Sequence, residues 1–138
     1  MSMDDIVPVT KDGQLYALFF KRKMPVDGAR FLTPPDASLQ VGVFERPKGH
    51  RVHAHRHAEQ DSAPTFGEFL YFEKGKAKVT VFDAEWEVLA ERIVQGGDFL
   101  LFLAGGHMLE ILEPARIVEV KHGPYPGEDA AKIFRDAP

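Results

Sequence analysis

Short apolar segments alternate with glycine- and proline-containing turns along most of the chain. The 12 glycines and 10 prolines divide it into pieces rich in Val, Ile, Phe and Leu, and this punctuation is typical of an all-β sandwich or barrel. The Gly96-Gly97-Asp98 segment predicts a tight turn, and Gly75 marks a junction between two strands. The predicted strands are Leu15–Phe20, Ala29–Leu32, Leu39–Glu45, Arg51–His57, Glu68–Glu73, Ala77–Phe82, Glu87–Val94, Phe99–Leu103, His107–Leu112 and Arg116–His122.

One exception to the β pattern lies near the C-terminus. The segment from Glu128 to Arg135 mixes apolar residues with charges and follows a Pro-Gly pair, which predicts a short C-terminal helix. The chain contains no internal repeat and no break in composition. We therefore expect a single domain over residues 1–138, with a core at about 39–122, an N-terminal arm at 1–38 and a C-terminal tail at 123–138.

Charge and composition narrow the classes of partner. The chain has 138 residues, of which 17 are Lys or Arg and 21 are Asp or Glu, so its formal charge is −4. A mildly acidic chain is a poor candidate for binding a nucleic-acid backbone, which needs a basic face, so we expect no nucleic-acid partner. The absence of cysteine excludes disulfides and thiolate ligands. The N-terminus does not resemble a signal peptide, and no apolar run approaches the roughly 18 residues of a membrane span. We expect a cytoplasmic protein with no membrane attachment.

Histidines are concentrated in one predicted strand. Four of the six fall within eight residues, at His50, His53, His55 and His57. Residues two apart on a strand share a face, so the last three histidines are expected on one face, with Arg51 beside them. A buried polar group without a partner costs about 1–3 kcal/mol, and a metal ion is one partner for imidazole. The alternative is a surface strand with solvated histidines.

Two further polar residues head apolar stripes on later strands. Glu68 is expected to share a face with Leu70 and Phe72, and His107 heads a stripe that continues through Leu109. A carboxylate or an imidazole in this position either lies at a strand end in solvent or binds a ligand.

The order of these residues resembles the two motifs of the cupin superfamily. In cupins, two histidines, a glutamate and a later histidine bind one metal ion inside a small barrel. The resemblance covers about residues 47–122 and implies a cupin-type double-stranded β-helix, or jelly-roll barrel. It further implies one divalent metal ion per chain, and the donor set suits Fe, Mn, Ni, Co or Zn. The ligands implied by the resemblance are His53, His55, Glu68 and His107.

The choice of histidine pair remains open at this stage. Twelve residues separate His55 from Glu68, a longer gap than most cupins have, so His55 and His57 form an alternative pair. If His57 is not a ligand, we expect it to line a substrate pocket with Arg51. A narrower resemblance favours the first pair: the Gly-Gly-His turn at His107 is similar to that of a little-characterised bacterial cupin group whose His-x-His is followed by a basic residue, here Arg56.

The resemblance leaves two classes of function. One is a small metalloenzyme of oxygenase or isomerase type, acting on a small polar metabolite such as a keto acid, a diketone or a sugar derivative. The other is a non-catalytic, metal-dependent module that binds or senses a small molecule. No P-loop, dinucleotide-binding glycine motif or nucleophilic serine elbow is present. The resemblance also implies a homodimer, in which Leu15–Phe20 would pair with the neighbour's open sheet edge.

Overall fold

Every regular element that the structure describes is a β-strand. The structure is a computed structural model, and it describes residues 5–57, 67–123 and 132–135. No helix long and apolar enough to cross a membrane occurs in these three ranges. The strands are β1 (Ile6–Lys11), β2 (Gln14–Phe20), β3 (Ala29–Phe31), β4 (Leu39–Arg46), β5 (Arg51–His57), β6 (Glu68–Phe82), β7 (Val88–Gln95), β8 (Phe99–Phe102), β9 (Gly106–His122) and β10 (Lys132–Phe134).

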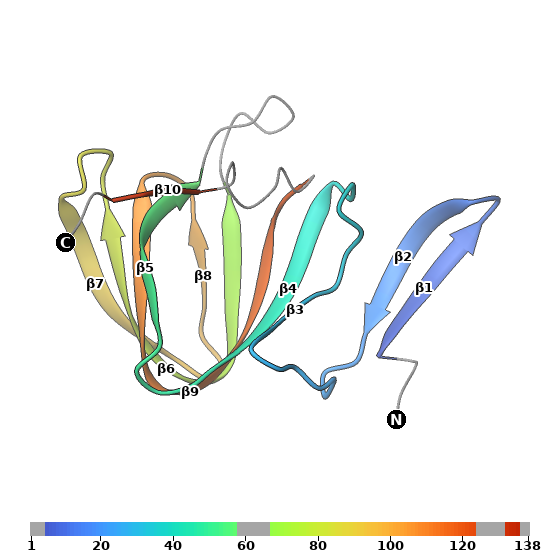
Figure 1. Ribbon diagram of the computed structural model, residues 1–138, viewed down its shortest axis with the longest axis horizontal. Helices are drawn as coiled ribbons and strands as arrows, with labels where there is room; N and C mark the ends of the chain where they lie inside the picture. Colours follow the sequence, from blue (N-terminus) through green and yellow to red (C-terminus); the bar gives the residue numbers. More distant parts are fainter. Residues whose placement is uncertain (1–4, 58–66, 124–131, 136–138) are drawn as a thin grey trace.

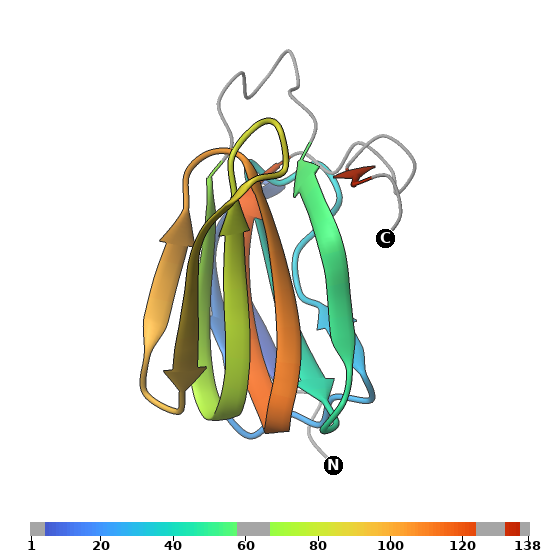
Figure 2. The same cartoon turned by 90° about the vertical axis from the view of Figure 1, so that its left-hand side faces the viewer.

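Two long bent strands, β6 and β9, organise an antiparallel jelly-roll barrel (Figures 1 and 2). Strand β9 pairs with β5 along its first half, with β4 along its second half and with β6 along most of its length. Strand β6 pairs with β8 through its first residues and with β7 through its last. Gly75 forms the bend in β6 with a φ of 96°, and a Cβ there would overlap the backbone of Ala115. This position therefore requires glycine.

The all-β prediction is confirmed, while several boundaries differ. The predicted pairs of strands on either side of Gly75 and of Pro114 are in fact the continuous strands β6 and β9. Strand β1 was missed. The predicted C-terminal helix is wrong for residues 132–134, which form β10 and pair antiparallel with β5. Edge pairing with β5 satisfies the backbone there, outweighing the local helical pattern. Residues 128–131 lie outside the described part of the chain.

Apolar side chains that point away from solvent fill the interior of the barrel. The central residues are Phe72, Ile111 and Ala77, each at most 1% exposed. Further buried members of the same cluster come from β6, β7, β8 and β9. A second, smaller cluster joins Met24 and Leu32 to Val43 of β4. The larger cluster forms the apolar interior of the barrel.

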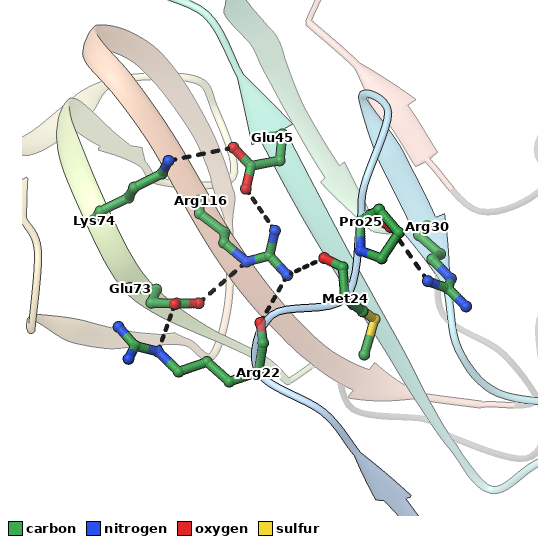
Figure 3. A network of polar contacts seen from close by, with 8 residues as sticks. All are labelled: Arg22, Met24, Pro25, Arg30, Glu45, Glu73, Lys74 and Arg116. Carbon is green, nitrogen blue, oxygen red and sulfur yellow. Dashed lines mark hydrogen bonds and ion pairs between the residues drawn. The ribbon is translucent and has the colours of Figure 1, made fainter. Parts of the chain in front are cut away.

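An arginine network fixes the segment that joins the N-terminal hairpin to the barrel (Figure 3). Strands β1 and β2 form a separate two-stranded sheet beside the barrel (Figure 1). The Arg116 side chain lies 2.6 Å from a Glu45 oxygen and 3.1 Å from a Glu73 oxygen. It also donates to the backbone carbonyls of Arg22 and Met24, at 3.0 and 2.9 Å. One side chain thus ties β4, β6 and β9 to the segment that follows the hairpin.

Candidate metal centre and pocket

A β-bulge in β5 decides which histidine faces the barrel interior. Val52 pairs with Leu109 and His55 pairs with His107 on β9. The two pairs are thus three residues apart on β5 but only two residues apart on β9. Because Leu109 and His107 share a face of β9, Val52 and His55 also share one. The regular alternation predicted for Arg51, His53 and His55 is therefore interrupted by the bulge, although all three residues line one pocket. A bulge inserts one residue and shifts the alternation, and the sequence pattern contains no signal for it.

Three of the predicted ligands lie together in the interior. His55, Glu68 and His107 are each 2% exposed. The His107 Nε2 atom lies 3.3 Å from Glu68 Oε1, and the ring centroids of His55 and His107 are 4.5 Å apart. They come from β5, β6 and β9, so three strands distant in sequence converge on one point. A carboxylate buried to this extent is stable only beside a cation or strong hydrogen-bond donors.

Backbone and aromatic contacts orient the two imidazoles. The His55 Nδ1 atom lies 2.7 Å from the carbonyl oxygen of His53. Because a carbonyl oxygen only accepts, Nδ1 carries the hydrogen and the neutral ring has its lone pair at Nε2. Histidines that ligate metals commonly donate their other ring nitrogen in this way. His107 stacks on Phe102, with centroids 3.9 Å apart and planes 5° apart, which restrains the orientation of its ring.

The remaining predicted site residues lie less deeply or outside the description. His53 and Arg51 are exposed, but both line the same pocket as the three buried residues. Arg51 also contacts the Met108 sulfur at 3.5 Å. The backbone of His57 belongs to β5, and its side chain lies outside the described part of the structure. The choice between the two histidine pairs is thus not tested, although His55 belongs to both.

The pocket has a volume of about 270 Å³, and residues of β4, β5, β6, β9 and β10 line it. Small-molecule sites typically start near 300 Å³, so a ligand of a few carbon atoms matches it. Its wall includes three polar residues that the sequence did not predict to lie there, namely Arg46, His50 and Glu119. The described lining consists of Phe44, Arg46, His50, Arg51, Val52, His53, His55, Glu68, Leu70, His107, Leu109, Ile117, Glu119 and Phe134.

Burial changes the electrostatics at the end of the pocket near Arg46. Desolvation lowers the pKa of Arg46, and the negative charge of Glu119 partly opposes this effect. Burial also lowers the pKa of His50, and the charges of Arg46 and His53 lower it further. Electrostatic effects of this kind require proximity, so Arg46, His50 and His53 are neighbours along the pocket wall.

The residues fit a divalent metal in donor chemistry. Two buried imidazoles and a buried carboxylate form an N/O donor set that suits Mn, Fe, Ni, Co or Zn. In the described part of the chain, no group of three or more such side chains already has the arrangement of a metal site. His107 and Glu68 are within ion-pair distance of each other. Both side chains could therefore hold the same ion, which requires a neutral imidazole and an ionised carboxylate.

Comparisons with known proteins identify the fold. No family model and no curated protein matches the chain. Among solved structures, oxalate decarboxylase from Bacillus subtilis aligns with 97% of this chain and 31% of its own, at 20% identity and a TM-score of 0.62. The Lactobacillus farciminis oxalate decarboxylase aligns with 96% of this chain over 34% of its own length, at 20% identity and a TM-score of 0.60. A cupin superfamily protein from Desulfitobacterium hafniense aligns with 68% of this chain over 74% of its own length, at 14% identity and a TM-score of 0.54.

The chain has the cupin fold. The motif order in the sequence predicted this fold, and both the jelly-roll topology and the structural neighbours confirm it. The chain spans about a third of the length of the two oxalate decarboxylases.

Proposed function

We propose that the chain is a metal-binding cupin protein that holds one divalent ion through His55, Glu68 and His107, with His53 as a fourth ligand. We further propose that it is a small metalloenzyme of oxygenase or isomerase type. Its substrate would be a small polar metabolite that chelates the ion, such as a keto acid, a diketone or a sugar derivative. Three imidazoles and one carboxylate would hold the ion, and the pocket beside them would admit the substrate.

The observation that carries this proposal is the convergence of three buried ligand-type side chains at an open pocket. His55, Glu68 and His107 are all 2% exposed, yet all three line a pocket of about 270 Å³. Imidazoles and a carboxylate are the N and O donors that divalent metals of this series bind. Ionisable groups gathered in a cleft are more frequent at functional sites than elsewhere.

The structural neighbours support the same reading. Oxalate decarboxylase from Bacillus subtilis contains Mn(II) centres, and an oxalate oxidase binds the substrate analogue glycolate. Both act on small organic acids. A chain with the same fold and an N/O donor set in the barrel is suited to a related class of ligand.

The chain's own residues divide the work at this site. A bound divalent ion would supply Lewis acidity and lower the pKa of a coordinated water. The His53 carbonyl holds the His55 ring in its Nδ1–H form, and Phe102 restrains His107. Leu70, Leu109 and Ile117 exclude water from one wall of the pocket. No serine, threonine, tyrosine or lysine lies in the described lining, so Glu119 and His50 are the remaining groups able to exchange a proton with a ligand.

Elemental analysis of the protein, purified without a histidine tag, tests the proposal. We expect close to one metal per chain after reconstitution with Fe(II), Mn(II), Ni(II) or Zn(II), and loss of that metal in His55→Ala. His55 belongs to both candidate histidine pairs, so the test does not depend on the choice between them. The control is His122→Ala, because His122 is exposed and does not line the pocket.

Two results would contradict the proposal. One is wild-type protein that takes up none of the four metals. The other is His55→Ala that retains the metal as well as His122→Ala does. A melting temperature that rises with metal in the wild type, and not in His55→Ala, would separate specific binding from loose surface association, because a ligand of the native state raises its stability.

The second candidate function is a binding or sensing module without turnover. It is favoured by the described lining of the pocket, which contains no serine, threonine, tyrosine or lysine side chain. A ligand recovered unchanged after long incubation with the Fe(II)-loaded protein and oxygen would support this reading. Conversion of that ligand would support the enzyme.

A further inference from the structure

The C-terminal strand β10 completes one side of the pocket. Strand β5 pairs with β9 along one edge and with β10 along the other, and β10 lies beside the C-terminal end of β5 (Figure 1). Phe134 pairs directly with His55, and directly paired residues have their side chains on the same face of a sheet. Phe134 accordingly lines the pocket together with His55. It lies in the predicted C-terminal tail, outside the residues 47–122 that carry the cupin resemblance.

The aromatic ring of Phe134 is a neighbour of a candidate metal ligand. Its centroid is 5.7 Å from that of the His55 ring, and the two planes are 47° apart. Across the other edge of β5, the His107 ring centroid is 4.5 Å from that of His55. An ion held by these two imidazoles would therefore have an apolar ring close to it on the β10 side. A ligand bound to that ion would reach Phe134 within a few atoms.

Contacts of the neighbouring residue hold β10 in place. The backbone N–H of Arg135 donates to the carbonyl oxygen of Ala54 at 3.1 Å. The Arg135 guanidinium carbon lies 5.0 Å from the centroid of the Phe82 ring, a cation–π arrangement, and Phe82 is 1% exposed. Arg135 does not line the pocket. Backbone pairing and Arg135 thus position the strand, so the place of β10 does not depend on the Phe134 ring alone.

Phe134 differs from the buried apolar residues of the pocket in its exposure. It is 55% exposed, whereas Leu70, Leu109 and Ile117 are each 4% exposed. The hydrophobic gain on binding is roughly proportional to the apolar area that is removed from water. Residues that are already buried can lose little more of their exposed area, while Phe134 retains apolar surface that a ligand can cover. An apolar group of the ligand would therefore gain most from contact with Phe134.

We propose that Phe134 selects ligands that have an apolar group next to their metal-chelating head. The head binds the ion, and the apolar group lies against the Phe134 ring. This inference rests on the proposed function, because the head requires the metal. It narrows the substrate class to small keto acids or diketones with an alkyl or aryl group. Sugar derivatives fit less well, because their hydroxyl groups would lose water against the ring.

Two probes that differ only in the length of an alkyl chain test this inference. 2-Oxobutanoate and 2-oxohexanoate share the metal-chelating oxo acid head, and the second has two additional methylene groups. Calorimetry measures their affinities for the Mn(II)-loaded protein. Burial of the additional methylene groups favours 2-oxohexanoate by up to about 15-fold. We expect this preference in the wild type, its retention in Phe134→Leu and its loss in Phe134→Ala, with unchanged affinity for 2-oxobutanoate.

The control variant is Phe99→Ala, which removes an exposed phenylalanine that does not line the pocket and should keep the preference. Equal affinity of the two acids for the wild type, or a preference in Phe134→Ala as large as that of the wild type, would overturn the inference. An equal loss of affinity for both acids in Phe134→Ala would also overturn it, because a purely structural role has this result.

Manganese is quantified in the same samples, so that the two proposals can fail separately. Bound metal without a preference refutes the role of Phe134 alone. Absence of metal from the wild type refutes the proposed function and this inference with it.

Discussion

Replacing Arg116 with methionine should destabilise the protein by about 2–4 kcal/mol. The Arg116 side chain is 11% exposed, and its partners Glu45 and Glu73 are 28% and 15% exposed. Removing one partner of a fully buried ion pair costs about 3–5 kcal/mol. These carboxylates keep some water, and each has another cation nearby, Lys74 or Arg22, which reduces the cost. Two backbone carbonyls also lose a charged hydrogen-bond donor, which adds to the free-energy cost of the substitution.

Equilibrium urea unfolding, followed by fluorescence of the single tryptophan, measures this loss. The matched control is Arg22→Gln: the Arg22 side chain is 74% exposed and lies 2.7 Å from Glu73, so its removal should cost less than about 1 kcal/mol. The m-value should not change, because the same surface is exposed on unfolding. If Arg116→Met and Arg22→Gln lost the same stability, or Arg116→Met lost less than about 1 kcal/mol, the network would not anchor the segment after the hairpin.

Three further predictions follow from packing and backbone geometry. Gly75→Ala should lower the free energy of unfolding in urea by about 2–5 kcal/mol, because the new Cβ would meet the Ala115 backbone. The control is Gly97→Ala, where φ is similar but the space around the Cβ is open. This variant should lower the free energy of unfolding by only about 1–2 kcal/mol. Phe72→Ala, at 0% exposure, should lose about 3–5 kcal/mol, and an equal loss in Phe99→Ala, at 69% exposure, would be contrary to expectation. We propose that a second copy covers the apolar β1–β2 hairpin, since an isolated hairpin is marginally stable. Deletion of residues 1–20 should then convert a dimer into a monomer in light scattering, and a soluble truncated protein with an unchanged number of subunits would argue against this role of the hairpin.

The fold could be predicted from the sequence because turn residues and short apolar strands occur in a regular order. Most predicted strand ends agree with the structure within a residue or two. The bends at Gly75 and Pro114 were read as strand ends, since a bent strand and two short strands have the same local pattern. The strand at Lys132–Phe134 was read as helix because its pairing with β5 is a long-range contact that local periodicity does not contain.

The site could be predicted only in part. The resemblance named His55, Glu68 and His107, and the structure brings these three together. The resemblance did not predict that His53 is exposed, because the orientation of His53 depends on the bulge in β5, and pairing with β9 sets the register of that bulge. Arg46 lies outside both motifs, so its place in the pocket emerges only when β4 is paired with β9.

Pulsed electron paramagnetic resonance of the Mn(II)-loaded protein tests the central claim most directly. Nitrogen bound to the metal produces a characteristic modulation, so the measurement reports imidazole ligands themselves. The account predicts clear ¹⁴N modulation in the wild type and a weaker modulation in His107→Gln, with the His122→Ala spectrum unchanged. Bound Mn(II) without ¹⁴N modulation in the wild type, or a His107→Gln spectrum identical to that of the wild type, would contradict the assignment of the barrel histidines as metal ligands.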